Sequence, residues 1–190
     1  KSAILLAGLA APGDTSVIEP APSRDHSERM LRHFGAEITV SDDAASGART
    51  VTLTGQPELA ARELSVPADI SSAAFPLAAA LIVPGSEVLL RNVGVNPLRA
   101  GLLDCVREMG GEIELCGEKE VSGEPVADIA VAASHLRGID VPAGRAPSMI
   151  DEYPILAALC ACADGPSRLR GLDELRHKES DRFAAILAGL

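Results

Sequence analysis

Residues 153–169 read YPILAALCACADGPSRL, and this stretch decides how the chain folds. An apolar run is followed by a glycine turn and a short segment suited to a strand. Two more stretches follow the same plan, AILLAGLAAPGDTSVI at residues 3–18 and FPLAAALIVPGSEVLL at residues 75–90. Each predicts an apolar helix, a turn and a strand, so the chain contains a repeat with a period of roughly 75 residues.

Glycines mark the helix ends within this repeat. Gly13, Gly85 and Gly165 occupy the turns, where the end of a helix needs a residue that can adopt positive φ. The second part of the unit also recurs, because RMLRHFGAEITV at residues 29–40 resembles CVREMGGEIEL at residues 105–115. An amphipathic helix that ends at glycine and a strand are predicted in both.

Two further strands complete each predicted unit. They are residues 49–54 and 63–67 in the first unit, and residues 126–132 and 138–141 in the second. The first helix of each unit is apolar on all sides, which predicts burial between sheets, and such units must pack with copies of themselves. The fold class is therefore α/β (α+β), built from repeated units with a joint near residues 68–70.

Composition excludes several classes of protein. The chain has 190 residues, of which 47% are hydrophobic, so it can bury a core. A formal net charge of -10 with 2% aromatic residues argues against a nucleic-acid partner. No apolar run approaches the roughly 20 residues of a membrane span. The cysteines and histidines lack the spacing of metal ligands, so no metal site is expected. Cys160 and Cys162 are interpreted as small core residues, and reduced thiols suit a cytoplasmic protein.

The first candidate site is the segment SRDHSE at residues 23–28. Ser23 or Asp25 can cap the following helix, and Asp25 with Glu28 has the spacing of a capping box. The alternative is a phosphate at the helix N-terminus, held by Arg24 and the hydroxyl of Ser23.

The second candidate site is RHKESDR at residues 176–182. Lys178 and Arg182 are four residues apart and are predicted to share a helical face, and Glu179 is three residues from Arg182. A solvated helix face with paired charges is one interpretation. Cations in the first turns oppose the helix macrodipole, however, and this favours a bound phosphate or carboxylate.

The third candidate is Asp151, which precedes the apolar helix of residues 153–163. Asp151 can act as its N-cap, although Ser148 offers an alternative cap. A half-buried carboxylate at this place could also hydrogen-bond a substrate hydroxyl or accept its proton. Ser71 and Ser72, at the equivalent place in the second unit, are interpreted as helix caps.

Several strings resemble the EPSP synthase family, the 3-phosphoshikimate 1-carboxyvinyltransferases of the shikimate pathway. They are PSRDHSERML, SSAAFPLAAALIVPGSEV, NPLRAGLLD, APSMIDEYPILA and LRHKESDR, and together they span the chain. APSMIDEYP is more similar to the bacterial class II type, which includes glyphosate-tolerant forms, than to the enteric class.

The resemblance implies the enolpyruvyl transferase fold, an inside-out α/β barrel type with βαβαββ units in two domains. Residues 1–68 would be the last unit of the first domain, and residues 69–190 about one and a half units of the second. Lys1 enters a helical pattern without a cap and Leu190 ends inside one, which indicates a central to C-terminal piece of a longer protein. The chain would therefore need the missing remainder of its parent.

The resemblance also implies the reaction. The enolpyruvyl group of phosphoenolpyruvate is transferred to the 5-hydroxyl of shikimate 3-phosphate by addition and elimination of phosphate, without a cofactor. Asp151 matches the proton acceptor and shikimate-binding carboxylate, and Glu179 the acid that delivers and removes the C3 proton. Lys178 matches a contact to shikimate 3-phosphate and Arg182 one to phosphoenolpyruvate. Ser23 and Arg24 match a further contact to the shikimate phosphate.

Two questions stay open at this point. Lys178 and Arg182 would lower the pKa of Glu179, whereas burial on domain closure would raise it. The alternatives for function are a UDP-N-acetylglucosamine enolpyruvyl transferase, which shares the fold and the chemistry, and a non-catalytic structural fragment. The 190 residues taken alone are expected to be inactive.

Overall fold

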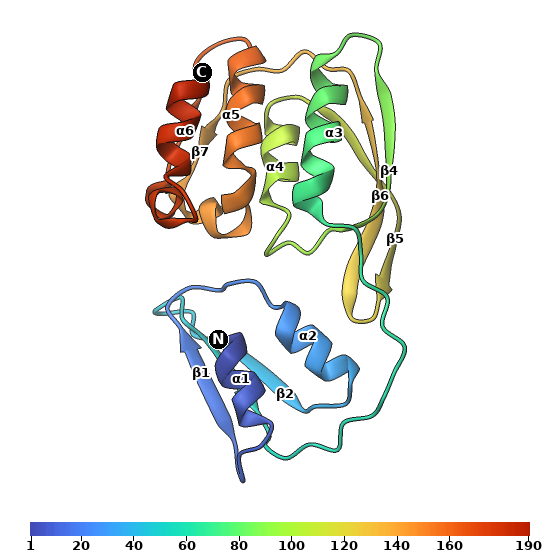
Figure 1. The fold of residues 1–190 in the computed structure, drawn as a ribbon, viewed down its shortest axis with the longest axis vertical. Coiled ribbons are helices and arrows are strands. Elements are labelled where there is room, and N and C mark those ends of the chain that lie inside the picture. The colour runs from blue at the N-terminus through green and yellow to red at the C-terminus, as the bar shows by residue number, and fades with distance from the viewer. The chain divides into compact units, whose positions relative to one another are not determined.

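The structure, a computed structural model, describes residues 1–190 and divides into two compact units. Unit 1 comprises Lys1–Val66 together with Glu120–Glu124, and unit 2 comprises Pro67–Lys119 and Pro125–Leu190 (Figure 1). The chain passes from one unit to the other two residues before the predicted end of the first segment. The assignment of the units to repeats of larger domains stays a prediction.

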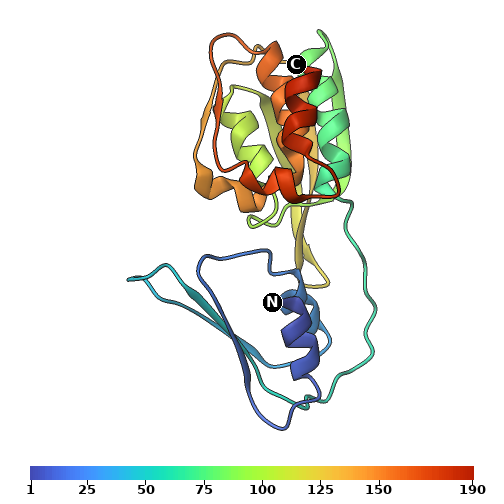
Figure 2. The same ribbon diagram turned by 60° about the vertical axis from the view of Figure 1, so that its left-hand side comes forward.

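Unit 1 is a three-stranded sheet with two helices on one face, as Figure 2 shows. The elements are α1 (Ser2–Gly8), β1 (Thr15–Glu19), α2 (His26–His33), β2 (Ile38–Asp42) and β3 (Arg49–Leu53). The strand order is β1-β3-β2, with both pairings antiparallel. The predicted helix and strand pattern is thus confirmed as far as Leu53.

The core of unit 1 follows from alternation along β3. Val51 and Leu53 point to the helices and are fully buried, and Val51 lies opposite Val17 in β1. Leu5 of α1 and Leu31 of α2 cover them. Each such side chain contributes about 1.5–3 kcal/mol on full burial.

Gly8 explains why α1 can lie close to the sheet. A Cβ at this position would come within 2.8 Å of Oγ1 of Thr15, at the start of β1. Only the absence of a side chain allows this approach, so the glycine inside the apolar run is a packing requirement.

The prediction of a strand at residues 63–67 is wrong. These residues form no ladder, and Leu64 and Val66 are 44% and 77% exposed. The segment leads from unit 1 into unit 2, and its apolar residues meet no sheet edge. The nearest pairing along the chain is an isolated bridge between Ala68 and Val93, inside unit 2.

Unit 2 contains the other elements in the predicted order, except for one short segment. They are α3 (Ile70–Ile82), β4 (Glu87–Gly94), α4 (Gly101–Glu108), β5 (Glu112–Val121), β6 (Glu124–Ala132), β7 (Asp140–Val141), α5 (Tyr153–Cys162), β8 (Arg168–Leu169) and α6 (Arg182–Gly189). The excepted segment is Glu120–Glu124, where β5 ends and β6 begins, and it belongs to unit 1. One sheet has the order β4-β6-β5, and β7 pairs in parallel with β8. Short 3₁₀ turns at Ala143–Ser148, Ile150–Glu152 and Asp173–His177 precede α5 and α6.

The helices of unit 2 pack together and against the sheet. Leu77 and Leu81 of α3, Leu102 of α4, and Tyr153 and Leu156 of α5 are almost completely buried in one cluster. The mixed α/β class predicted from the sequence is confirmed, and no helix has the length and apolar character needed to cross a membrane.

The prediction that the apolar helices are buried on all sides is wrong for this chain. Ile4 and Leu6 of α1 are 50% and 48% exposed, and Phe75 of α3 is 62% exposed. Each unit has a sheet on only one side of its apolar helix, so the opposite face keeps its apolar residues at the surface.

Gly138 should be intolerant of a side chain, because a Cβ there would overlap the carbonyl oxygen of Pro166. Gly138→Ala is expected to lower the free energy of unfolding by about 1–3 kcal/mol, the usual cost of overpacking. Urea denaturation followed by circular dichroism measures this. Gly144→Ala is the matched control, since nothing lies within 4 Å of its Cβ position. Equal stability of the two variants would contradict the prediction.

Candidate functional site

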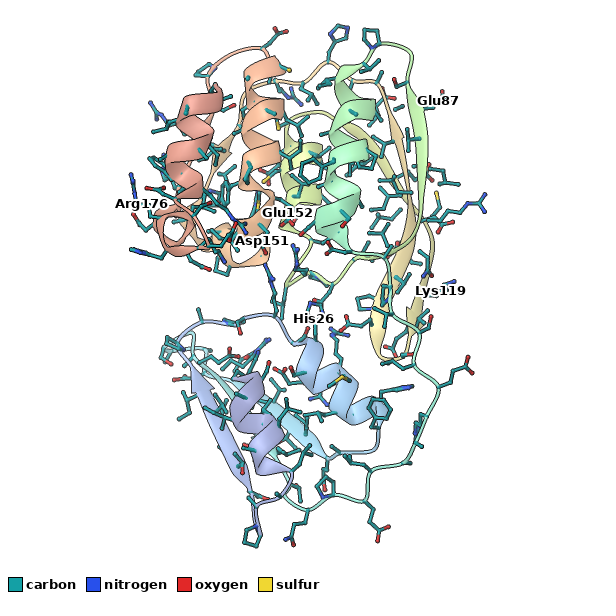
Figure 3. The ribbon with its side chains drawn as sticks, viewed as in Figure 1. His26, Glu87, Lys119, Asp151, Glu152 and Arg176 are labelled. Carbon is teal, nitrogen blue, oxygen red and sulfur yellow. The ribbon has the colours of Figure 1, made fainter.

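Asp151 lies in unit 2 on the 3₁₀ turn Ile150–Glu152, directly before α5 (Figure 3). The prediction that it caps the helix is wrong. The N-cap residue of α5 is Glu152, which makes no side-chain cap bond, and the Ser148 hydroxyl instead donates to the carbonyl of Arg145. Asp151 lies inside the 3₁₀ turn, one residue before the N-cap, and its carboxylate contacts other side chains.

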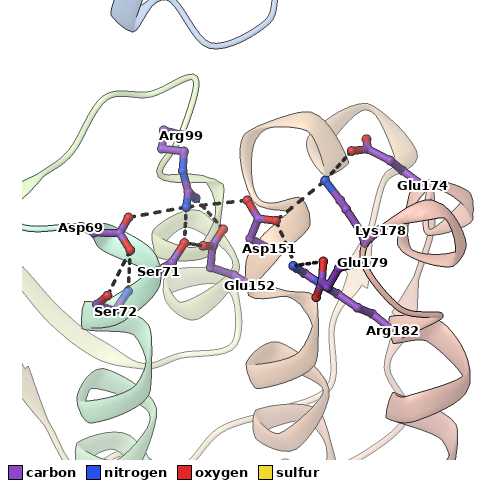
Figure 4. A network of polar contacts seen from close by, with 10 residues as sticks. All are labelled: Asp69, Ser71, Ser72, Arg99, Asp151, Glu152, Glu174, Lys178, Glu179 and Arg182. Atoms are coloured by element: carbon purple, nitrogen blue, oxygen red, sulfur yellow. Dashed lines mark hydrogen bonds and ion pairs between the residues drawn. The ribbon is translucent and has the colours of Figure 1, made fainter.

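Three cations surround the Asp151 carboxylate (Figure 4). Nη1 of Arg182 donates to Oδ1 at 3.2 Å, and Nζ of Lys178 lies 3.8 Å from the same oxygen. Nη2 of Arg99 lies 3.9 Å from Oδ2. The Asp151 side chain is 26% exposed, so it is partly shielded from water yet open to a ligand.

The prediction that Lys178 and Arg182 share a helical face is wrong. The helix α6 begins at Arg182, and Asp181 caps it by accepting a hydrogen bond from the Ala184 amide at 2.9 Å. Lys178 follows the 3₁₀ turn Asp173–His177 in an extended conformation. The two cations still meet at Asp151, because the loop between the turn and the helix brings them there.

Both cations also have acidic partners on the exposed side. Arg182 donates two hydrogen bonds to Glu179, each 2.9 Å long, so the predicted contact of this pair is present. Nζ of Lys178 lies 2.6 Å from Oε1 of Glu174. Glu174 and Glu179 are 60% and 67% exposed, and water screens exposed pairs of this kind so that they contribute little. An anionic ligand could therefore replace either carboxylate at small cost.

The structure shows whether the neighbouring cations or burial has the larger effect on the pKa of Glu179. The hydrogen bonds from Arg182 lower the pKa of the Glu179 carboxyl, and burial, which acts the other way, is the smaller effect. Glu179 is therefore ionised at neutral pH and able to accept a proton. Its pKa must rise before it can donate one.

Arg99 is a site residue that sequence reasoning missed, and Glu152 was predicted only as a second acid beside Asp151, without a partner. Nη1 of Arg99 lies 2.7 Å from Oε2 of Glu152, and the two residues are 9% and 1% exposed. Ser71 donates to Glu152 and accepts from Arg99. The prediction that Ser71 and Ser72 cap α3 is wrong, because Asp69 is the N-cap and accepts from the Ser72 amide. The available signal for Arg99 was its place between apolar residues in NPLRAGLLD. Such a place indicates a buried charge, and a buried charge needs a partner.

Ser23 and Arg24 lie in unit 1, in the loop before α2. The Ser23 hydroxyl donates to the carboxylate of Glu19. Asp25 is the N-cap residue but makes no side-chain cap bond, and it accepts from Nε of Arg29 at 2.9 Å instead. The predicted capping box is therefore wrong.

Glu28, the other half of that box, is 1% exposed, and its Oε1 lies 2.8 Å from Nζ of Lys1. A buried ion pair thus replaces the expected cap, and Nζ of Lys1 also lies 3.5 Å from the carbonyl oxygen of Ser23.

The four cysteines differ in exposure and surroundings. All four cysteines are free, and Cys162 is exposed, so its interpretation as a core residue is wrong. Burial raises the pKa of the Cys105 and Cys160 thiols, which keeps them protonated at neutral pH. No three histidine, cysteine or carboxylate side chains are grouped so that they could hold a metal ion.

Comparisons of the sequence and of the structure with known proteins show which family the chain belongs to. The family model of EPSP synthase (3-phosphoshikimate 1-carboxyvinyltransferase) matches residues 1–190. The 3-phosphoshikimate 1-carboxyvinyltransferases of Methylorubrum populi and Rhodospirillum rubrum are 65% and 61% identical to the chain over its full length. The chain covers 42% of each of these relatives. The chain belongs to the EPSP synthase family.

Solved structures agree with the fold. The EPSP synthase from Acinetobacter baumannii superposes with a TM-score of 0.90 at 44% identity, over 100% of this chain and 42% of the other. The enolpyruvyl transferase NikO from Streptomyces tendae has a TM-score of 0.61 at 19% identity and covers 86% of this chain and 36% of its own, which shows the fold alone. The chain therefore has the fold of the enolpyruvyl transferases.

The pKa of Glu179 should depend on Arg182. In Arg182→Gln, the pKa of the Glu179 carboxyl should rise towards its ordinary value, because the hydrogen bonds that favour the ionised form are lost. A ¹³C NMR titration of the labelled carboxyl measures this.

The lowered pKa of Glu179 also contributes to the stability of the fold. This contribution is fully present above the pKa that Glu179 has in the unfolded chain, and it is lost as the pH falls through the lower pKa in the folded chain. Arg176→Gln is the control, because Arg176 pairs with Asp181 and not with Glu179. An unchanged Glu179 titration in Arg182→Gln would contradict the assignment.

Proposed function

We propose that the chain forms part of a 3-phosphoshikimate 1-carboxyvinyltransferase that joins shikimate 3-phosphate and phosphoenolpyruvate. The 5-hydroxyl adds to C2 of phosphoenolpyruvate as C3 takes up a proton, and the resulting methyl group then loses a proton as phosphate leaves C2. The observation that carries the proposal is the convergence of Lys178 and Arg182 on Asp151, with Glu179 beside them, in a chain whose whole length matches the family. Two anionic substrates need the cations, and two proton transfers need the carboxylates.

Asp151 has the geometry for the substrate hydroxyls. Its carboxylate is 26% exposed and lies between cations on both sides, so part of it is open to a ligand. It would hydrogen-bond the shikimate hydroxyls and take the proton of the 5-hydroxyl as that oxygen attacks C2.

Lys178 and Arg182 would bind the two substrates. Lys178 would exchange Glu174 for the 3-phosphate of shikimate 3-phosphate, and Arg182 would exchange Glu179 for phosphoenolpyruvate. The planar guanidinium suits a carboxylate or phosphate better than an ammonium group does. Ser23 and Arg24, on the loop before α2, would supply a further contact to the shikimate phosphate.

Substrate binding would then prepare Glu179 for its role. The same Arg182 hydrogen bonds that lower the pKa of Glu179 would turn to phosphoenolpyruvate, and the pKa of Glu179 would rise. A carboxyl released in this way can carry a proton to C3 and remove one from the methyl group of the intermediate. Arg182 thus couples the arrival of the substrate to the protonation of the acid.

The proposal includes the rest of the parent chain. The relatives are more than twice as long as these 190 residues, and we assign residues 1–68 to the last unit of one domain and residues 69–190 to the second domain. The missing segments would complete the contacts to both substrates, so the isolated chain would be inactive. No metal or other cofactor enters the proposed reaction, and a cytoplasmic location suits the free thiols.

The reaction can be tested with the full-length protein that contains these residues. Release of inorganic phosphate should require both shikimate 3-phosphate and phosphoenolpyruvate, because phosphate leaves only after the hydroxyl has added. Asp151→Asn should reduce kcat by about 10²–10⁴-fold, the usual contribution of a positioned acid or base. Activity with UDP-N-acetylglucosamine in place of shikimate 3-phosphate would support the alternative enolpyruvyl transferase, and no activity with either would support a structural fragment.

The role of Glu179 has a separate test. Glu179→Gln should abolish exchange of the C3 protons of phosphoenolpyruvate with deuterated solvent, because the amide cannot transfer them. Mass spectrometry of the recovered phosphoenolpyruvate measures the exchange, and calorimetry should show nearly unchanged binding of shikimate 3-phosphate. Glu174→Gln is the matched control and should keep exchange. Exchange that survives in Glu179→Gln would exclude Glu179 as the C3 acid.

A further inference from the structure

We infer that Arg99 is a positioning residue for the reaction and that it acts through the carboxylate of Asp151. The inference rests on the proposed function, because it assigns Asp151 a role at the substrate hydroxyl. Arg99 precedes α4 in the turn that follows β4, and it is far along the chain from both Asp69 and Asp151.

One guanidinium connects the starts of two helices. Nη1 of Arg99 bonds Glu152 at the start of α5, and Nη2 bonds Ser71 in the first turn of α3 (Figure 4). Ser71 closes a ring of three by donating to the other oxygen of Glu152. The same Nη2 lies 3.7 Å from Asp69, the N-cap of α3. The planar fork of arginine makes these contacts at once, which a lysine cannot do.

Glu152 needs this partner. Its side chain is 1% exposed, and an ionised carboxylate at such a place is tolerated only when it is paired and hydrogen-bonded. Asp151 is its neighbour in the sequence and also carries a carboxylate. Without Arg99, Glu152 would be an uncompensated buried charge directly beside Asp151.

Arg99 and the two other cations hold opposite oxygens of Asp151. Oδ1 faces Arg182 and Lys178, which belong to the segment that would bind the substrates. Oδ2 faces Arg99, which is 10% exposed in its side chain and fixed by Glu152 and Ser71. When anionic substrates draw Lys178 and Arg182 away, Arg99 remains as the cation that orients Asp151 towards the hydroxyl.

Removal of both charges of the buried pair separates positioning from stability. Arg99→Gln/Glu152→Gln in the full-length protein takes away the ion pair without leaving either charge alone, so the large cost of an uncompensated buried charge is avoided. We expect a melting temperature within a few degrees of the wild type, a kcat lowered by about 10–100-fold, and KM values for both substrates changed by less than about 3-fold. A misplaced catalytic group produces this pattern.

A matched pair supplies the control. Arg145 and Glu108 form a bidentate ion pair in unit 2, with contacts of 2.8 and 2.6 Å, and touch none of the candidate site residues. Arg145→Gln/Glu108→Gln should keep the wild-type kcat. In an Asp151→Asn background, the Arg99→Gln/Glu152→Gln substitution should lower kcat no further, because its effect passes through the Asp151 carboxylate.

The outcomes distinguish the inference from the function it rests on. A full-length wild type without phosphate release overturns both. An active wild type together with an Arg99→Gln/Glu152→Gln variant of wild-type kcat overturns the role of Arg99 alone, as does an equal loss of kcat with and without Asp151. If the double variant does not fold, Arg99→Lys decides, since it keeps the charge and loses the fork. A wild-type kcat in folded Arg99→Lys overturns the inference.

Discussion

The ion pair between Arg99 and Glu152 is the contact on which the candidate site depends. Glu152 lies at the start of α5 with 1% of its side chain exposed, and a charge there is stable only with a partner of opposite sign. Arg99 supplies the charge and also bonds Ser71 at the start of α3. The starts of α3 and α5 and the turn before α4 are thereby connected to one another. Asp151 is the residue before Glu152, so this contact also positions Asp151.

Around this buried ion pair, the outer part of the site consists of ion pairs with exposed glutamates. Lys178 and Arg182 each contact Asp151 on the inner side and an exposed glutamate on the outer side. The inner contacts keep the cations in place, while the outer ones are weak because water screens them. Without a ligand, Lys178 and Arg182 thus each lie between one inner carboxylate and one exposed outer carboxylate.

Much of the fold could be predicted from local pattern. The glycine at the end of each helix needs a backbone conformation that other residues avoid, and Gly85, Gly110 and Gly165 all adopt positive φ. The strand predicted at residues 63–67 failed, because β propensity does not reveal whether a partner edge is present. The cap predicted at Asp151 failed for a related reason, since a 3₁₀ turn places Glu152, and not Asp151, at the boundary of α5.

The sequence by itself determined the repeat, the α/β class, the family and the cluster of charged residues around Lys178 and Arg182. The class and the charged cluster depend on the order of residues over short stretches, where helix and strand periodicity acts. The repeat depends on the recurrence of one pattern along the chain, and the family rests on the resemblance of several strings to known members. Only the tertiary structure decided that Arg99 pairs with Glu152 and that Asp151 lies between three cations. Such contacts join residues 53 positions apart or 31 positions apart, and their energy depends on burial and distance, which packing sets and local sequence does not encode.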